Sequence, residues 1–284
     1  MGLGLVLEGG AHRTIFSCGV MDALLDAGIR ADYVIGASAG ITYGVSYVSG
    51  QNGRNREMLR RFVRSPKYMG MLHRLDPRNQ AYYNLDFVFG TIPDKLLPFD
   101  YAAYEAFRGS TLAAVTNILT GEAEYLEVRN GDTGWNVLRA TCALPLLFKP
   151  IRIGEGLYAD GGVADSIPFE KALADGCEKV IVVLTRERTY RKKPEGMMDL
   201  AAKHYRKRYP AYAELLRTRH ERYNACAELL AQKEQEGTVY VIAPEDTLGV
   251  GRTERNVEKL MALYAQGYSL TMQQCTALWN YLES

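Results

Sequence analysis

Residues 33–40 read Y-V-I-G-A-S-A-G, a short apolar run that leads directly into a serine between small residues. The run at 33–35 predicts a buried strand, and the apolar and small residues that continue to about Ser49 predict a helix. A strand that turns sharply into a helix needs small residues at the bend and exposes the central side chain over the helix N-terminus. The motif therefore predicts a nucleophile elbow, and the alternative is a helix start packed closely on a sheet. Its members are Ser38 at the tip, with Gly36, Ala37, Ala39 and Gly40 around it.

An earlier strand leads into a glycine-rich loop. Residues 3–8 (L-G-L-V-L-E) predict a buried strand, E-G-G-A-H-R follows at 8–13, and a helical apolar stripe covers 12–27. Successive glycines let backbone N–H groups converge on one point, so the loop predicts an oxyanion hole or a phosphate cradle. The loop does not match the dinucleotide-binding fingerprint, because positions 11 and 14 are not glycine. The alternative to an oxyanion hole or phosphate cradle is an ordinary glycine-rich turn. The oxyanion-hole candidates are Gly9, Gly10, Ala11 and Arg13, and His12 between them is expected to be exposed.

The third motif is D-G-G at 160–162, which follows a hairpin predicted at 151–159. Asp160 is a candidate base if it faces Ser38, and Gly161 and Gly162 complete the motif. Taken alone, the tripeptide favours an ordinary tight turn, for which Asp-Gly is a common choice.

The rest of the pattern predicts one α/β domain over residues 1–284. Further strands are expected at 111–119, 123–128, 179–185 and 238–243, with helices at 134–144 and 168–175. Residues 79–108 show only weak periodicity. The C-terminal part, 196–284, is expected to be helical and packed on the same domain, with a break or kink at Pro210 and an interruption near Gly267.

Together the motifs resemble the patatin-like phospholipases, in their bacterial branch. The resemblance implies a three-layer α/β/α fold with a central, mostly parallel sheet, and a Ser38–Asp160 dyad that acts on lipid acyl esters. Ala11 and Thr14 stand where that family usually has glycine. We expect these departures to affect the reaction rate and the range of substrates more than the reaction class. Thr14 is expected to cap the helix or narrow the cleft. The matching pieces, from residue 3 to about 185, are L-V-L-E-G-G-A-H-R, V-I-G-A-S-A-G, R-A-T-C-A-L-P (139–145) and Y-A-D-G-G-V-A-D-S-I-P (158–168).

A serine hydroxyl is a weak nucleophile and needs a base. The resemblance gives that role to Asp160, with the N–H groups of residues 9–11 holding the oxyanion, Arg13 supporting them, and no metal or other cofactor. One alternative is an α/β-hydrolase triad with His204 or His220, although both lie among basic residues that predict solvated helix faces. The other alternative is a catalytically impaired lipid- or membrane-binding protein.

Composition limits the cellular role. The chain has 284 residues, 47% hydrophobic and 24% charged, and its net charge of +1 disfavours a protein that coats nucleic acid. Five cysteines without a C-x-x-C spacing predict reduced, mostly buried thiols and a cytoplasmic location. No signal peptide is recognisable, and the uncharged stretch 33–53 is too polar to predict a membrane span.

Charge is distributed unevenly along the chain. Residues 52–78 carry a net charge of +6 and residues 186–222 one of +7, whereas the remainder carries −12. The two segments predict a face for anionic lipid headgroups and peripheral contact with the inner face of the membrane; two solvated helix faces are the alternative. The expected partner is a phospholipid or another acyl-ester lipid, and no nucleic acid. The tyrosines expected at such a face are Tyr68, Tyr205, Tyr209 and Tyr212.

Overall fold

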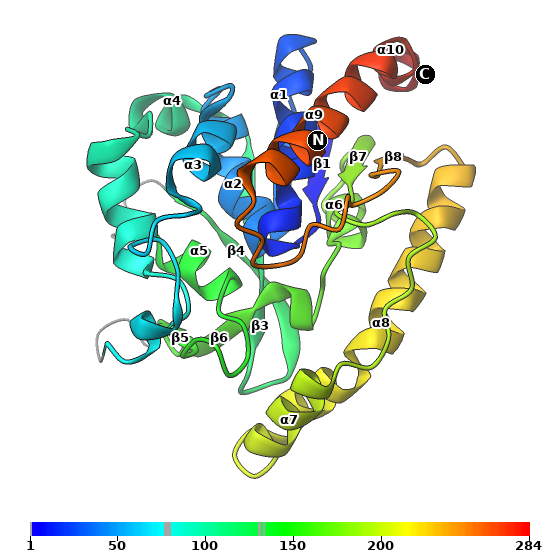
Figure 1. The fold of residues 1–284 in the computed structure, drawn as a ribbon. Helices are drawn as coiled ribbons and strands as arrows, with labels where there is room; N and C mark the ends of the chain where they lie inside the picture. The colour runs from blue at the N-terminus through cyan, green and yellow to red at the C-terminus, as the bar shows by residue number, and fades with distance from the viewer. Residues whose placement is uncertain (1, 77–80, 130–131, 133) are drawn as a thin grey trace.

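An eight-stranded sheet forms the middle layer of the protein (Figure 1). The computed structural model describes residues 2–76, 81–129, 132 and 134–284. Every strand falls on a segment for which the sequence predicts one, with differences of a few residues at the ends. The strands are β1 (Leu3–Leu7), β2 (Tyr33–Ala37), β3 (Ser110–Asn117), β4 (Glu122–Glu127), β5 (Ile151–Ile153), β6 (Gly156–Asp160), β7 (Lys179–Val183) and β8 (Val239–Ile242).

The parallel part of the sheet has the order β3-β2-β1-β7-β8, so the first strand of the chain lies at its centre. Strands β4, β5 and β6 are antiparallel and extend the sheet at the β3 side. The predicted central, mostly parallel sheet is therefore confirmed, and the antiparallel strands lie on its β3 side.

Strands β2 and β6 share one edge of β3. The other edge of β3 is occupied by β4, from Leu112 to Asn117. Strand β2 pairs with the first half of β3 and ends where Ala37 lies opposite Ala114, and β6 pairs with the second half, with Asp160 opposite Val115. Because β6 is antiparallel to β3 and β2 is parallel to it, the C-terminal ends of β2 and β6 meet head to head.

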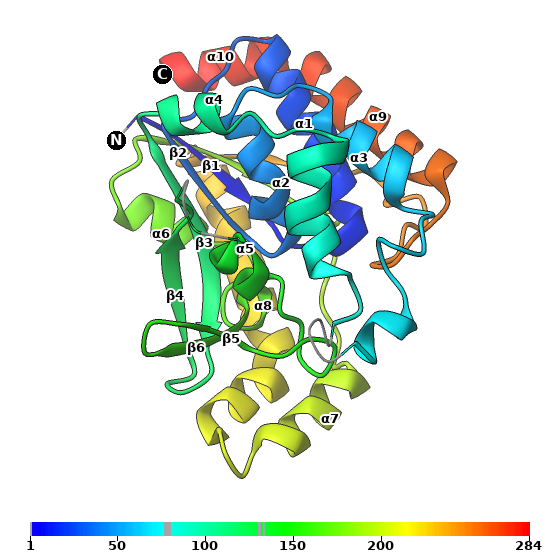
Figure 2. The ribbon, with the colours of Figure 1, turned by 90° about the vertical axis from the view of Figure 1, so that its left-hand side faces the viewer.

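Helices cover both faces of the sheet (Figures 1 and 2), which confirms the predicted three layers. Successive residues of a strand point to opposite faces, so Leu5 and Leu7 pack under α1 (Ile15–Asp26), α2 (Ala39–Val48) and α9 (Val257–Gln273). Val6 points to the other face, under α6 (Phe169–Ala174) and α8 (Pro210–Gln235). The remaining α-helices are α3 (Arg54–Phe62), α4 (Tyr101–Ala106), α5 (Asn136–Thr141), α7 (Gly196–Tyr205) and α10 (Cys275–Glu283).

The C-terminal helical part divides at Pro210, as predicted. Helix α7 ends at Tyr205 and α8 begins with Pro210. Proline fits the first turn of a helix because the N–H that it lacks has no partner there. Helix α7 packs against α8, which continues along the sheet to β8 (Figure 1).

The predicted interruption near Gly267 is wrong. Helix α9 continues through this residue, and the helical segment divides at Gln274 instead. The glycine serves close helix packing: a Cβ on Gly267 would overlap the carbonyl oxygen of Phe16 in α1. A Cβ on Gly19 of α1 would likewise overlap the carbonyl oxygen of Tyr264 in α9. The two backbones thus touch at reciprocal glycines.

The weakly periodic segment 79–108 contains α4 and a π-helical stretch, η3 (Phe87–Leu96). Hydrogen bonds in a π-helix span five residues, so its sequence does not show the 3.6-residue period of an α-helix. Residues 79 and 80 lie outside the described residues. In the part of the chain that the structure describes, no helix combines the length and apolarity needed to cross a bilayer.

Two expectations about side-chain exposure are corrected. All five cysteines are free, but only Cys18 and Cys177 are buried, and the other three are half-buried. Tyr68 and Tyr212 are buried rather than placed at a lipid face. The two basic segments do not lie together along their whole length: α3 and the turn between α7 and α8 lie at opposite ends of the molecule (Figures 1 and 2), whereas Arg74 of the first segment reaches Leu146, which packs near Tyr205 at the end of α7. Residues 77 and 78 fall outside the described residues.

We predict that Gly267→Ala lowers the free energy of unfolding by about 1–3 kcal/mol, the usual cost of forcing a methyl group into a filled contact. The matched control is Gly196→Ala in the first turn of α7, where an added Cβ meets no atom within 4 Å. Alanine should be neutral or stabilising there. Urea unfolding measures both variants, and equal stability of the two would contradict the role of the glycine contact.

Candidate active site

Ser38 forms the bend between β2 and α2. Its backbone has φ 51° and ψ −130°, a strained conformation for a residue with a side chain and one typical of a functional turn. The Ser38 N–H donates to Thr141 Oγ1 (2.8 Å), and the Thr141 hydroxyl donates to the carbonyl oxygen of Ala114 (2.5 Å). Thr141 therefore links the elbow to β3, and the sequence analysis assigned it no role.

Small residues around the elbow allow the close approach of β1. Gly36 and Ala37 end β2, and Ala39 and Gly40 begin α2. A Cβ on Gly40 would overlap the carbonyl oxygen of Leu7, so only glycine lets α2 start this close to β1.

Asp160 ends β6 and faces the elbow from the opposite direction. Its carboxylate is buried, and Oδ1 accepts a hydrogen bond from the N–H of Gly162 (2.8 Å), which lies with Gly161 in the short 3₁₀ turn η4 (Gly161–Val163). Oδ2 has no hydrogen-bond partner among the described residues. Burial raises the pKa of Asp160, opposed by the nearby Ser38 hydroxyl and by the positive charge of Arg219.

The Ser38 hydroxyl points to a sulfur atom in this structure. Its Oγ lies 3.9 Å from Cys142 Sγ, which also contacts Thr42 Oγ1 at 3.2 Å. Burial raises the pKa of Cys142 to about 12, so this side chain is a neutral thiol beside the serine. A rotation of the Ser38 side chain toward the free oxygen of Asp160 would complete the pair.

The glycine loop lies against Ser38. A Cβ on Gly9 would come within 3.2 Å of Ser38 Cβ, which shows how closely the two backbones approach. Among the described residues, the N–H groups of Gly10 and Ala11 donate to no other group. Ala11 has φ 51°, in the left-handed region that favours glycine, so this alanine holds a conformation suited to the glycine that the family pattern has there.

Three loop residues are buried more deeply than the sequence suggested. His12 is not exposed: its Nδ1 lies 2.6 Å from the carbonyl oxygen of Glu254, and burial lowers its pKa to about 4. Thr14 is fully buried and makes no capping hydrogen bond, so the expectation of a cap is wrong. Arg13 is also buried, and burial followed by the charges of Arg186 and Arg252 lowers its pKa to about 10.

Two pockets meet at Ser38. One is apolar, and its lining includes Tyr43, Met58, Leu85, Phe89, Leu138 and Phe148. The second, which we name the cationic recess, is lined by Ser38, Asp160 and five basic side chains. These five are Arg13, Arg186, Lys192, Arg219 and Arg252.

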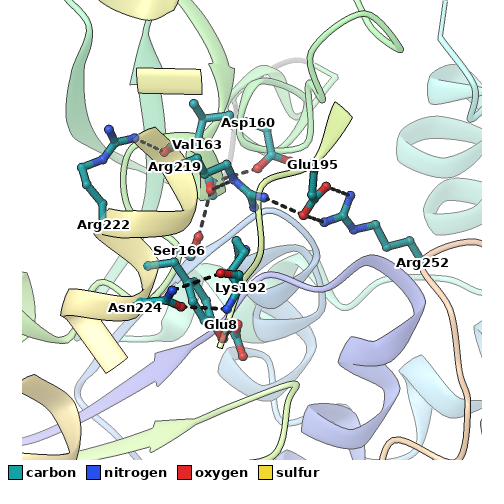
Figure 3. Close-up of polar contacts among 12 residues, drawn as sticks. Glu8, Asp160, Val163, Ser166, Lys192, Glu195, Arg219, Arg222, Asn224 and Arg252 are labelled. Atoms are coloured by element: carbon teal, nitrogen blue, oxygen red, sulfur yellow. Dashed lines mark hydrogen bonds and ion pairs between the residues drawn. The ribbon is translucent and has the colours of Figure 1, made fainter. Parts of the chain in front are cut away.

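The charged residues around the recess form a network (Figure 3). Arg219 Nε donates to the carbonyl oxygen of Gly162 (2.7 Å), directly beside Asp160. Glu195 lies 3.5 Å from Arg219 and accepts two hydrogen bonds from Arg252 (2.9 and 3.1 Å). Segments far apart in the sequence are thus tied to the D-G-G turn.

This network was not predicted, because the run of basic residues around 217–222 is typical of a solvated helix face. The helical spacing of Leu216, Arg219, Tyr223, Cys226 and Leu230 was the available signal, since these positions share one face of α8. An arginine on that otherwise apolar face indicates an internal partner. Its neighbour Arg222 likewise donates to the carbonyl oxygen of Val163 (2.8 Å; Figure 3).

Neither late histidine lines a pocket with Ser38. His204 is exposed at the end of α7, and His220 contacts Glu221 at 3.8 Å and lines a separate pocket with Lys193 and Asp199. Within the described ranges, no three His, Cys, Asp or Glu side chains gather as possible metal ligands.

The sequence and the fold of this chain are similar to those of known proteins. The family model described as patatin-like phospholipase matches residues 5–173, and a second model, a domain of unknown function (DUF6363), matches residues 209–283. The chain is 27% identical over 188 residues to lysophospholipase NTE1 of Yarrowia lipolytica and 28% identical over 189 residues to the uncharacterized protein YjjU of Escherichia coli.

These matches cover part of each protein. Both cover 64% of this chain, but 12% of the Yarrowia protein and 52% of YjjU, so the chain spans no more than about half the length of these curated relatives. The crystal structure of VipD from Legionella pneumophila matches with a TM-score of 0.44 and 16% identity, over 97% of this chain and 66% of that chain. The family model alone matches more than half of the chain and contains the glycine loop, the elbow and the D-G-G turn, so this chain belongs to the patatin-like phospholipase family.

Proposed function

We propose that the protein is a lipid acyl hydrolase that cleaves fatty acyl esters with Ser38 and Asp160. The observation that carries this proposal is the head-to-head meeting of β2 and β6, which brings a strained serine and a buried carboxylate together between an apolar pocket and a polar one. Membership of the patatin-like phospholipase family supports the same reaction class.

In the proposed reaction Ser38 Oγ attacks the ester carbonyl while Asp160 Oδ2 takes its proton. The N–H groups of Gly10 and Ala11 hydrogen-bond to the oxyanion, and Arg13 behind them adds positive charge. Asp160 then returns the proton to the leaving alcohol, and an acyl-enzyme remains. A water molecule gives a proton to Asp160 and attacks the acyl carbonyl, and Asp160 passes this proton to Ser38 Oγ as the fatty acid is released.

The apolar pocket suits the acyl chain of the substrate. It starts at Ser38 and continues between α2, α3 and η3 over aliphatic and aromatic side chains such as Met58, Phe89 and Leu138. His12 also lines it, and its lowered pKa keeps the imidazole neutral there at pH 7.

We predict that Ser38→Ala abolishes covalent labelling by a fluorophosphonate probe and lowers kcat/KM on a short-chain ester by at least about 10⁴-fold. Asp160→Asn should lower kcat/KM by about 10²–10⁴-fold, since a general base is lost. His204→Ala and His220→Ala are the controls and should stay within about threefold. If either histidine variant lost as much activity as Asp160→Asn, a Ser-His-Asp triad would be favoured. If the wild-type protein bound vesicles but was not labelled by the probe, a non-enzymatic lipid-binding protein would be favoured.

Because Asp160 is buried, we expect its ionised form, which the proposed reaction needs, to lower the stability of the fold. The pKa of Asp160 is raised in the folded state, so folding favours the protonated carboxyl. The free energy of unfolding is therefore highest below the unfolded-state pKa of about 3.9, and it falls as the pH rises through the folded-state pKa. We expect Asp160→Asn to have a higher Tm than wild type at pH 7 and the same Tm below about pH 4. The exposed Glu245→Gln is the control, and a lower Tm for Asp160→Asn at pH 7 would contradict this account.

We further propose that the protein contacts anionic membranes through the turn between α7 and α8 and the 3₁₀ turn η2 (Met71–Arg74). The turn between α7 and α8 exposes three basic side chains, Arg206, Lys207 and Arg208. In η2 the side chain of Leu72 is 79% exposed. The two turns flank Leu146, which packs near Tyr205 and accepts a hydrogen bond from Arg74 (3.2 Å). Leu144, two residues earlier, lines both pockets at Ser38, so this surface adjoins the site.

We predict that reversing the charges of Arg206, Lys207 and Arg208 lowers binding to phosphatidylglycerol vesicles by more than about 100-fold, at about 1 kcal/mol for each side chain. High salt should have a similar effect on wild type. Hydrolysis of a soluble short-chain ester should not change. The same reversal at Arg60 and Arg61 on α3, at the other end of the molecule, is the control, and equal losses in both variants would contradict a localised contact.

A further inference from the structure

The apolar pocket that starts at Ser38 contains an arginine at its other end. The pocket follows α2 as far as Val45, and its lining also includes Arg54 and Asn55, the first two residues of α3. Asn55 Oδ1 accepts a hydrogen bond from the Ser46 hydroxyl (2.9 Å), which places the start of α3 beside the end of α2. Helix α2 rises by about 12 Å between Ser38 and Ser46, so Ser38 and Arg54 lie at opposite ends of the pocket along this helix.

Arg54 has a buried donor without an acceptor. Its Nη2 atom donates to the carbonyl oxygen of Leu97 (2.9 Å), and its guanidinium lies over the ring of Phe99 (5.2 Å). Its Nε atom is buried and has no hydrogen-bond partner among the described residues. Burial lowers the pKa of Arg54 to about 10, which leaves the guanidinium charged at neutral pH. A buried donor without an acceptor is costly, so the arrangement suits an acceptor that a ligand brings.

In the part of the chain that the structure describes, no carboxylate pairs with Arg54. Near the end of η3, Asp94 accepts a hydrogen bond from the Tyr101 hydroxyl (2.7 Å). Asp100, the N-cap of α4, accepts one from the N–H of Ala103 (2.9 Å). Arg54 is also the first residue of α3, at the positive end of the helix dipole, where a cation is unfavourable. A negative group of a ligand at this point would be stabilised by the guanidinium and by the helix end together.

We propose that the end of the apolar pocket at Arg54 binds a carboxylate, and that the preferred acyl chain of the substrate ends in this carboxylate. This inference rests on the proposed hydrolase function and names the acyl part of its substrate. Ser38 attacks the ester at one end of the chain while Arg54 holds the other end, and the apolar lining between them covers the methylene groups. The planar guanidinium presents its donors in a fixed arrangement that suits carboxylate oxygens. A simple alkyl chain would instead place a methyl group beside a charge.

The test compares p-nitrophenyl esters of two acids with equal chain length: a dicarboxylic acid, whose far end is a carboxylate, and the simple alkanoic acid. We expect wild type to prefer the carboxylate-ended ester by at least about tenfold in kcat/KM, as for one charge-assisted hydrogen bond. In a series from butanoyl to dodecanoyl chains, the preference should be greatest where the extended chain spans the distance of about 12 Å along α2.

Substitutions on α3 test whether Arg54 causes this preference. Arg54→Met should remove it, and Arg54→Lys should keep part of it, because lysine retains the charge without the planar guanidinium. Arg56→Met is the matched control, since Arg56 is exposed on the same helix and does not line the pocket. A merely structural loss at Arg54 would lower the hydrolysis of both esters and leave their ratio unchanged. An unchanged ratio in Arg54→Met, or no preference in wild type at any chain length, would overturn the proposal.

Trp135 provides a readout that does not depend on activity. It lines the pocket and packs edge-on against Phe99 (5.5 Å between ring centroids), the ring over which Arg54 lies. The chain has two tryptophans, so Trp279→Phe leaves Trp135 as the only one. In the double variant Ser38→Ala/Trp279→Phe, the monomethyl ester of the best dicarboxylic acid should change the fluorescence of Trp135. Its apparent Kd should be about tenfold lower than that of the methyl alkanoate of equal length, and Arg54→Met should remove this difference.

A free fatty acid offers the same alkyl carboxylate and distinguishes its source. If a fatty acid changes the fluorescence of Trp135 only when Arg54 is present, while the two p-nitrophenyl esters are hydrolysed equally, the site binds free fatty acid and the substrate assignment is wrong. If neither ester is hydrolysed but the monomethyl ester still binds through Arg54, the hydrolase function fails and the carboxylate site stands.

Discussion

The shared edge of β3 determines where Ser38 and Asp160 meet. A strand of eight residues accommodates the end of β2 and the end of β6 in one line, because the first pairs up to Ala114 and the second from Val115. The backbone hydrogen bonds of a sheet fix this register. Ser38 and Asp160, which are far apart in the sequence, consequently lie at the same place along β3. Thr141 strengthens the arrangement by joining the elbow to the same strand.

The environment of Asp160 explains how a carboxylate could serve as the base for a serine. Water would hold the pKa of an aspartate near its ordinary low value and make it a poor proton acceptor. Burial raises the pKa of Asp160, whereas the Arg219 guanidinium, which is anchored by Glu195 and by the carbonyl oxygen of Gly162, limits the rise. The net effect is a carboxylate that is more basic than an aspartate in water. The free Oδ2 atom then provides an acceptor with no competing donor among the described residues.

The features of the fold and the site that depend on neighbours in the chain could be predicted from the sequence. Alternation and apolar runs predicted all eight strands, and the small residues at 36–40 predicted the sharp turn at Ser38. Features that depend on distant partners were not predictable. Gly267 looks like a helix breaker until the backbone of Phe16 in another helix is known to lie against it, and His12 looks exposed until its contact with the carbonyl oxygen of Glu254 is known. The head-to-head register of β2 and β6 is of this second kind.

The division of labour along the chain follows from the same geometry. The family model spans residues 5–173, which supply Ser38, Asp160 and the glycine loop. Four of the five basic side chains of the cationic recess come from beyond that range: Arg186 and Lys192 from the segment after β7, and Arg219 and Arg252 from the C-terminal part. A parallel sheet presents the loops at its carboxyl ends together, so the segment after β7 necessarily lies beside the loops after β1 and β2. The part of the chain that follows the family core thus supplies most of the positive charge beside Ser38, while the core supplies both residues of the proposed Ser38–Asp160 pair.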